Sequence, residues 1–208
     1  MLLLLGAMGC SSNLSSEDPI CDPRDLTETE VRFRPLLCGE EHIRQGETRR
    51  GDWLLENNQI RIALRDPGTS LTSFEGTGGS IVDIARPYGV DGILELVPWE
   101  DEFLDVESFS LTEGTSGLTV TLGESNAKLH LAANEARISF LGGVDWLLRP
   151  MPGTDVIGQQ IHPPHGKYVY ATDADIQDLG GDLILEGIQT LTIGEAEEVF
   201  QWLDDFQF

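Results

Sequence analysis

The sequence predicts an all-β protein, a large antiparallel β-sandwich of about twelve strands with a short C-terminal helix. Short runs of alternating apolar and polar residues recur along the chain, and turn residues separate them. Such runs are typical of antiparallel sheets. The 23 glycines agree with many tight turns, and 208 residues with an apolar fraction of 40% are enough for one folded domain.

The clearest strand signals lie between residues 51 and 98. Trp53–Glu56 and Gln59–Arg65 flank an Asn-Asn turn, and Ile81–Ala85 follows a glycine-rich turn. Ile93–Val97 comes after an Asp-Gly pair. Residues of this kind between apolar runs favour tight turns, so this part of the chain is expected to form successive antiparallel strands.

The second half of the chain continues the same pattern up to its last residues. Further strands are expected at Leu118–Leu122, Lys128–Leu131, Ala136–Phe140, Val144–Arg149, Val156–Ile161, Lys167–Thr172, Asp182–Leu185 and Ile188–Ile193. In Glu195–Phe206, apolar residues instead recur at helical spacing, with glutamates at the N-terminal end. A short closing helix is predicted there.

The N-terminus has the composition of an export signal. Residues 1–9 are apolar and small, but they are too short for a transmembrane helix, which needs about 20 residues. Cys10 and the residues before it resemble the lipobox of bacterial lipoproteins, in which this cysteine is lipidated and becomes the mature N-terminus. The resemblance implies a membrane anchor, and Ser11 implies the outer membrane, with the protein facing the periplasm or the exterior. The alternative is an apolar N-terminus with an incidental cysteine.

The remaining two cysteines, Cys21 and Cys38, form an even pair once Cys10 is assigned to lipid. An exported compartment is oxidising, so the two are expected to form a disulfide, which would stabilise the fold by roughly 3 kcal/mol. Two buried free thiols are the alternative. Residues 10–40 are interpreted as a lipidated, disulfide-pinned tether in which Val31–Cys38 is a candidate first strand, and residues 41–208 as the sandwich domain.

The acidic composition limits the partners of this protein. Thirteen basic residues stand against 36 acidic ones, which gives a net charge of −23. Nucleic acid and anionic membrane surfaces repel such a charge, so membrane contact is expected through the lipid anchor only. The acidity serves as a solvated surface or, alternatively, attracts a cation or a basic partner.

Two groups of residues are candidates for ligand binding. Trp99 lies among acidic residues, either as part of an edge strand or as a platform for a sugar ring. His162 and His165 have His-x-x-His spacing, but the prolines between them do not direct both imidazoles to one side. A stiff surface loop is the simpler interpretation of that motif.

Four aspartates, Asp173, Asp175, Asp178 and Asp182, are a candidate calcium site, because calcium prefers several oxygen ligands on a flexible loop. The order of an EF-hand loop is absent, and an ordinary turn is the alternative. No nucleophile motif or phosphate loop occurs. The sequence therefore favours a non-enzymatic protein without a cofactor, with Ca²⁺ as the alternative.

The segments Gly51–Asn57, Gln59–Ile62 and Gly78–Asp83 resemble a module in exported proteins and lipoproteins of myxobacteria, mostly of unassigned function. They are more faintly similar to the opening of galactose-mutarotase-like sandwiches. The leading hypothesis is a lipid-anchored binding or structural module for a glycan or an envelope protein. The alternatives are a carbohydrate-active enzyme of mutarotase-like form, using His162, His165 and Glu186 around a cleft, and a calcium-stabilised adhesin domain.

Overall fold

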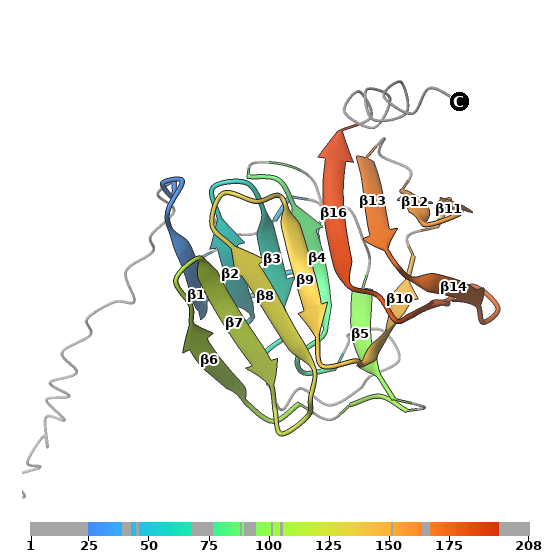
Figure 1. Ribbon diagram of the computed structural model, residues 1–208, viewed down its shortest axis with the longest axis horizontal. Helices are drawn as coiled ribbons and strands as arrows, with labels where there is room; N and C mark the ends of the chain where they lie inside the picture. Colours follow the sequence, from blue (N-terminus) through green and yellow to red (C-terminus); the bar gives the residue numbers. More distant parts are fainter. Residues whose placement is uncertain are drawn as a thin grey trace, which may run out of the picture.

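The computed structural model is all-β, which confirms the predicted fold class. It describes residues 25–38, 43–44, 46–67, 77–87, 89, 95–100, 102–104, 106–150, 152–163 and 167–195. Within these ranges the chain forms sixteen strands and no helix, and the strands make two eight-stranded antiparallel sheets (Figure 1). None of the described residues belongs to a helix that could cross a bilayer.

The first sheet contains most of the N-terminal half of the chain. Its strands, in spatial order, are β1 (Val31–Pro35), β2 (Trp53–Asn57), β3 (Arg61–Leu64), β4 (Ile81–Ala85), β5 (Glu95–Trp99), β10 (Asp145–Arg149), β15 (Leu183–Glu186) and β14 (Asp175–Asp178). The run from β1 to β5 follows the order of the sequence, as expected for strands joined by turns. The edge strands of this sheet are β1 and β14.

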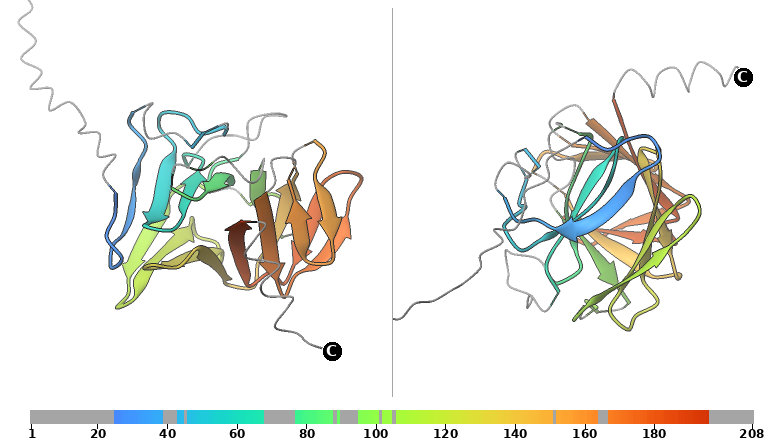
Figure 2. Two further views of the ribbon diagram at one scale, coloured as in Figure 1. Left: turned by 90° about the horizontal axis from the view of Figure 1, so that it is seen from above. Right: turned by 90° about the vertical axis from the view of Figure 1, so that its left-hand side faces the viewer.

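The second sheet contains most of the C-terminal half. Its strands, in spatial order, are β11 (Asp155–Ile157), β12 (Gln160–His162), β13 (Lys167–Thr172), β16 (Thr190–Glu195), β9 (Arg137–Leu141), β8 (Lys128–Ala132), β7 (Gly117–Leu122) and β6 (Phe109–Glu113). At one end of the molecule, β1 and β2 lie over β6 and β7 (Figure 2). The edge strands β1 and β6 therefore belong to the same end of the sandwich.

The hydrophobic core lies between the two sheets. On β7 the apolar residues Leu118, Val120 and Leu122 are buried, and they alternate with half-buried residues. Phe140 and Trp146 meet in the core edge to face, with ring centroids 4.9 Å apart. This alternation is the pattern that the sequence predicts for strands with one face against a core.

A second, smaller apolar cluster contains residues of the first sheet together with residues from the segment that follows β1. Leu36 and Ile43 come from that segment and pack with Leu54, Ala63 and Ala85. Leu54 and Leu55 are neighbours on β2, yet they belong to the small cluster and to the main core respectively. The first sheet therefore buries apolar side chains on both of its faces.

Asn57 joins the two sheets at the turn between β2 and β3. Its side-chain amide donates hydrogen bonds to the carbonyl oxygens of Ala132 (2.7 Å) and Glu135 (2.8 Å), at the end of β8 and in the turn that follows. Its Oδ1 accepts hydrogen bonds from the backbone N–H groups of Gln59 (2.7 Å) and Ile60 (2.9 Å). All these bonds are formed by one buried side chain.

The structure contains more strands than the sequence predicts. β6 and β14 were not expected, and both have mostly exposed residues. The predicted single strand Val156–Ile161 is wrong: it is a hairpin of β11 and β12 that turns at Gly158, which has a φ of +61°. A residue in the left-handed backbone conformation interrupts the extended chain, and glycine adopts this conformation without steric cost.

Two predicted boundaries also differ. Val31–Pro35 forms β1, paired with β2 along its whole length, so the sandwich begins within the segment interpreted as a tether. The closing helix was expected from Glu195, but Glu195 is the last residue of β16. The rest of the predicted helix, residues 196–206, lies outside the described residues.

Candidate functional site

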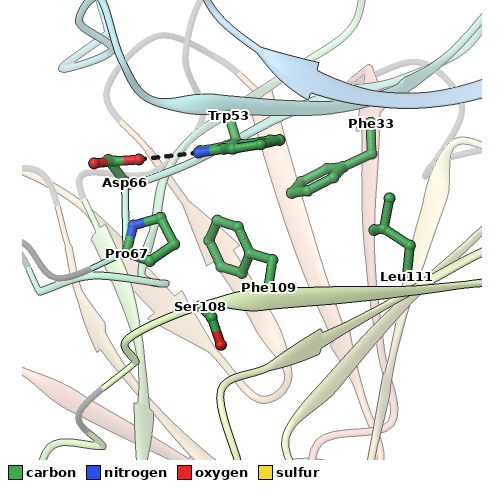
Figure 3. Close-up of a pocket in the computed structure, with 7 residues that line it drawn as sticks. All are labelled: Phe33, Trp53, Asp66, Pro67, Ser108, Phe109 and Leu111. Carbon is green, nitrogen blue, oxygen red and sulfur yellow. Dashed lines mark hydrogen bonds between the residues drawn. The ribbon is translucent and has the colours of Figure 1, made fainter.

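A cleft of about 330 Å³ opens between the edge strands β1 and β6, at the end of the sandwich where the two sheets face each other (Figure 3). Its lining residues come from β1, the start of β2, the segment after β3 and the start of β6: Phe33, Trp53, Asp66, Pro67, Ser108, Phe109 and Leu111. Most of this lining is apolar. The volume lies at the low end of the range for small-ligand sites.

The alternation of β1 directs Phe33 toward the cleft. Phe33 packs against the main core, whereas its neighbours Arg32 and Arg34 contact Glu56. The Nε of Arg32 and the Nη2 of Arg34 lie 2.9 and 3.2 Å from Glu56 Oε1, and Arg61 Nε lies 3.0 Å from Oε2. The Glu56 side chain is only 5% exposed. These ion pairs hold β1 against β2 and β3 from the face opposite Phe33.

Three aromatic rings form one continuous surface in the cleft. Phe33 stacks on Trp53 with ring centroids 5.0 Å apart and an interplanar angle of 19°. Phe109 meets both rings edge to face, at 5.4 Å from Phe33 and 5.8 Å from Trp53. These are favourable aromatic geometries, worth about 0.5–1.5 kcal/mol per pair beyond area burial. The rings therefore hold one another in place.

Asp66 fixes the orientation of the indole. Trp53 pairs with the last residue of β3, so Asp66, two residues further on, lies beside it. The indole Nε1–H donates a hydrogen bond of 3.0 Å to Asp66 Oδ1 (Figure 3). The backbone of Asp66 is held in turn by a hydrogen bond to Asp52 Oδ1 (3.2 Å), and Asp52 forms a buried ion pair of 2.8 Å with Arg65. A rigid support of this kind fixes a binding surface before the ligand arrives.

The cleft is open to solvent at its rim. Leu111 is 50% exposed, and Asp66 is exposed as well. Among the described residues, only Trp53 donates a side-chain hydrogen bond to Asp66, and it uses Oδ1. Within the described part of the chain, no side chain donates a hydrogen bond to the second carboxylate oxygen. Figure 3 shows the Ser108 hydroxyl pointing away from Trp53 and Asp66. The cleft therefore offers an aromatic surface with one carboxylate beside it.

The residues that the sequence singled out for ligand binding lie elsewhere. Trp99 ends β5 and packs edge to face on Phe103, with centroids 5.1 Å apart. His162 is in β12 of the second sheet, and Glu186 is at the end of β15 of the first sheet, where it accepts a hydrogen bond from Gln177. None of them lines the cleft. His165 lies outside the described residues.

The four aspartates of the candidate calcium site do not converge. Asp178 Oδ1 accepts hydrogen bonds from the backbone N–H groups of Gly180 (2.8 Å) and Gly181 (3.1 Å), which is the role of a turn-forming aspartate. Asp182 lies 3.9 Å from Arg149, and Asp173 has a φ of +61° in the turn before β14. Asp175 is exposed in β14. In the part of the chain that the structure describes, no three His, Cys, Asp or Glu side chains are arranged to hold a metal ion.

The cysteine predictions are not settled by the structure. Cys10 and Cys21 lie outside the described residues. Lipidation of Cys10 and the disulfide between Cys21 and Cys38 therefore stay predictions.

The three aromatic residues of the cleft were not identified as site residues from the sequence. Phe33, Trp53 and Phe109 are far apart in the chain; Phe33 and Trp53 look like ordinary apolar positions in predicted strands, and Phe109 lies where no strand was predicted.

Comparisons with known proteins add no candidate site, since no family model, no curated protein and no solved structure matches this chain. The chemistry of the cleft must therefore be read from its own side chains. Among the described residues that line it, one has a carboxylate and one a hydroxyl, and none is a histidine, cysteine, lysine or arginine. General acid–base or nucleophilic catalysis usually requires a second polar group in contact with the first. The arrangement suits binding.

Proposed function

We propose that this protein is a lipid-anchored β-sandwich of the bacterial cell envelope that binds a glycan through the aromatic cleft and does not convert it chemically. The observation that carries the proposal is the continuous surface of Phe33, Trp53 and Phe109 with Asp66 at its rim. A sugar ring has an apolar face of C–H groups and a rim of hydroxyl groups. The first matches the aromatic surface and the second matches the carboxylate.

The volume of the cleft supports a ligand of limited size. A volume of about 330 Å³ suits one or two sugar rings. Further sugar units of a longer glycan would extend along the rim into solvent. The aromatic residues are packed against the core and against one another, so little side-chain entropy is lost on binding. Binding of a chain end or of one unit in a longer polymer is the mode that this geometry favours.

The envelope location rests on the N-terminal sequence. Cys10 follows an apolar segment with small residues, and several acyl chains on that cysteine would give a stable anchor, at about 0.8 kcal/mol per buried CH₂ group. Replacement of Cys10 by serine should move the protein from the membrane fraction to the soluble fraction of the envelope. Mass spectrometry of the mature N-terminus tests the same point, and an unmodified Cys10 would refute the anchor.

Glycan binding can be tested with the purified protein on an array of envelope and plant polysaccharides. We expect Trp53→Ala to weaken binding about tenfold or more, because the largest ring of the aromatic surface is lost. Trp99→Ala is the matched control, since it also removes a half-buried indole that packs edge to face on a phenylalanine. Circular dichroism must show that both variants keep the fold.

Two results would contradict the proposed function. One is an array on which the wild-type protein retains no glycan. The other is a glycan that binds Trp53→Ala as tightly as the wild type, since the cleft would then not be the binding surface.

A further inference from the structure

We infer that the cleft selects glycans that carry a free ammonium group, that is, amino sugars without an N-acetyl group, over neutral and acidic sugars. This inference rests on the proposed function and names the class of ligand. Of the described residues that line the cleft, Asp66 alone is charged, and it lies at the rim, next to the indole of Trp53. A carboxylate beside an aromatic surface is complementary to a cationic group on an apolar ring.

The position of Asp66 allows it to meet a cation together with the indole. Its Oδ1 accepts the Trp53 Nε1–H at 3.0 Å, which places the carboxylate at the edge of the ring. An ammonium group that binds to Oδ2 would thus lie close to the aromatic surface as well. An ion pair at an exposed site favours the ammonium group by up to about fivefold in affinity.

The charges around the cleft do not cancel that of Asp66. The nearest arginine in sequence, Arg65, is buried against Asp52 with only 3% of its side chain exposed. Arg32 and Arg34 contact Glu56 from the opposite face of the first sheet. The protein as a whole carries a net charge of −23. A uronic acid or a phosphorylated sugar would be repelled by this field, and an ammonium group would be attracted to it.

Three trisaccharides separate these possibilities: the trimer of glucosamine, its fully N-acetylated form, and trigalacturonate. Titration calorimetry with the full-length protein at slightly acidic pH, where the amines are protonated, measures each affinity. We expect the glucosamine trimer to bind about fivefold more tightly than the acetylated trimer, and trigalacturonate to bind most weakly. The advantage of the glucosamine trimer should shrink at high salt.

Asp66→Asn tests the carboxylate itself, because the amide oxygen keeps an acceptor for the indole N–H while the charge is lost. This variant should lose about fivefold affinity for the glucosamine trimer and stay within about twofold for the acetylated trimer. Asp155→Asn is the charge-matched control. It removes an exposed carboxylate from β11, at the other edge of the second sheet from β6.

Each outcome decides between the two proposals. Equal binding of the glucosamine and acetylated trimers, or an equal loss of both in Asp66→Asn, would overturn the preference for ammonium groups and leave glycan binding intact. If none of the three binds and the polysaccharide array is also empty, both proposals fail. A glucosamine preference that Asp155→Asn removes as fully as Asp66→Asn would show that net charge, and not the cleft, is responsible.

Discussion

Replacement of Asn57 by alanine should destabilise this protein far more than the loss of an average polar side chain. Asn57 is 2% exposed and uses both amide hydrogens and its oxygen to connect the β2–β3 turn with the end of β8. The substitution removes the buried part of the link between the two sheets at this turn and leaves the exposed bonds of Asn58 and Gln59 to Asn134 in place. It leaves the hydrophobic core between the sheets unchanged.

The expected loss follows from the four hydrogen bonds of this side chain. Each typical hydrogen bond contributes about 1 kcal/mol, and a buried group left without a partner costs about 1–3 kcal/mol. The backbone N–H of Ile60 is buried and loses the Asn57 oxygen, while the carbonyl groups of Ala132 and Glu135 lie where water can partly replace the amide. A loss of about 3–5 kcal/mol in the free energy of unfolding is expected, out of a typical total of about 5–15 kcal/mol.

Equilibrium unfolding in urea, followed by circular dichroism, measures this loss. Asn58→Ala is the matched control, because the neighbouring amide forms a single exposed bond of 3.0 Å to Asn134. It should cost less than about 1 kcal/mol. If the two variants unfold within about 1 kcal/mol of each other with equal m-values, the cross-sheet bonds do not have the importance that the structure gives them.

Two further substitutions test the packing of the fold in the same unfolding assay. Gly142→Ala should cost at least about 2 kcal/mol, because Gly142 has a φ of +102° and a Cβ there would collide with the backbone carbonyl of Asn126. Gly143→Ala is the control: Gly143 has a φ of +71° but open space around it, so this substitution should cost about 1 kcal/mol. Equal losses would show that the backbone relaxes at Gly142. Arg65→Met should cost about 3–5 kcal/mol, because the buried Asp52 carboxylate loses its cationic partner and keeps only backbone N–H donors. A second substitution, Asp52→Asn, should recover part of that loss. A loss below about 1 kcal/mol in the single variant would mean that water replaces the arginine.

The strands that the sequence predicts well are those with one buried face and one solvated face. β7, β8 and β9 have this alternation, so period 2 identifies them without ambiguity. β6 and β14 were missed because their residues are mostly exposed and polar, as is usual at sheet edges. A strand that buries neither face leaves little pattern in the sequence.

The candidate site was less predictable than the fold. Trp53 was identified only as the start of a strand, whereas Trp99, because of its acidic neighbours, was considered either part of an edge strand or a platform for a sugar ring. Trp53 and Trp99 differ in the aromatic residues that pack against them. β1 and β6 bring Phe33 and Phe109 to Trp53, whereas Trp99 contacts Phe103 four residues away. A cleft made by edge strands of two sheets depends on topology, which a single sequence does not specify.

The position of β1 gives this fold a mechanical property. β1 is the first of the described strands and an edge strand, so a pull on the preceding residues reaches it before the other strands that the structure describes. Only β2 pairs with it, and a force that peels β1 away would open their backbone bonds one after another. Because Phe33 is on β1, such a force would also remove one wall of the cleft. If the protein is tethered at Cys10 as proposed and the predicted Cys21–Cys38 disulfide is reduced, tension would release the ligand before the rest of the sandwich unfolds. With the disulfide formed, the force would pass from Cys21 to Cys38 and leave β1 in place.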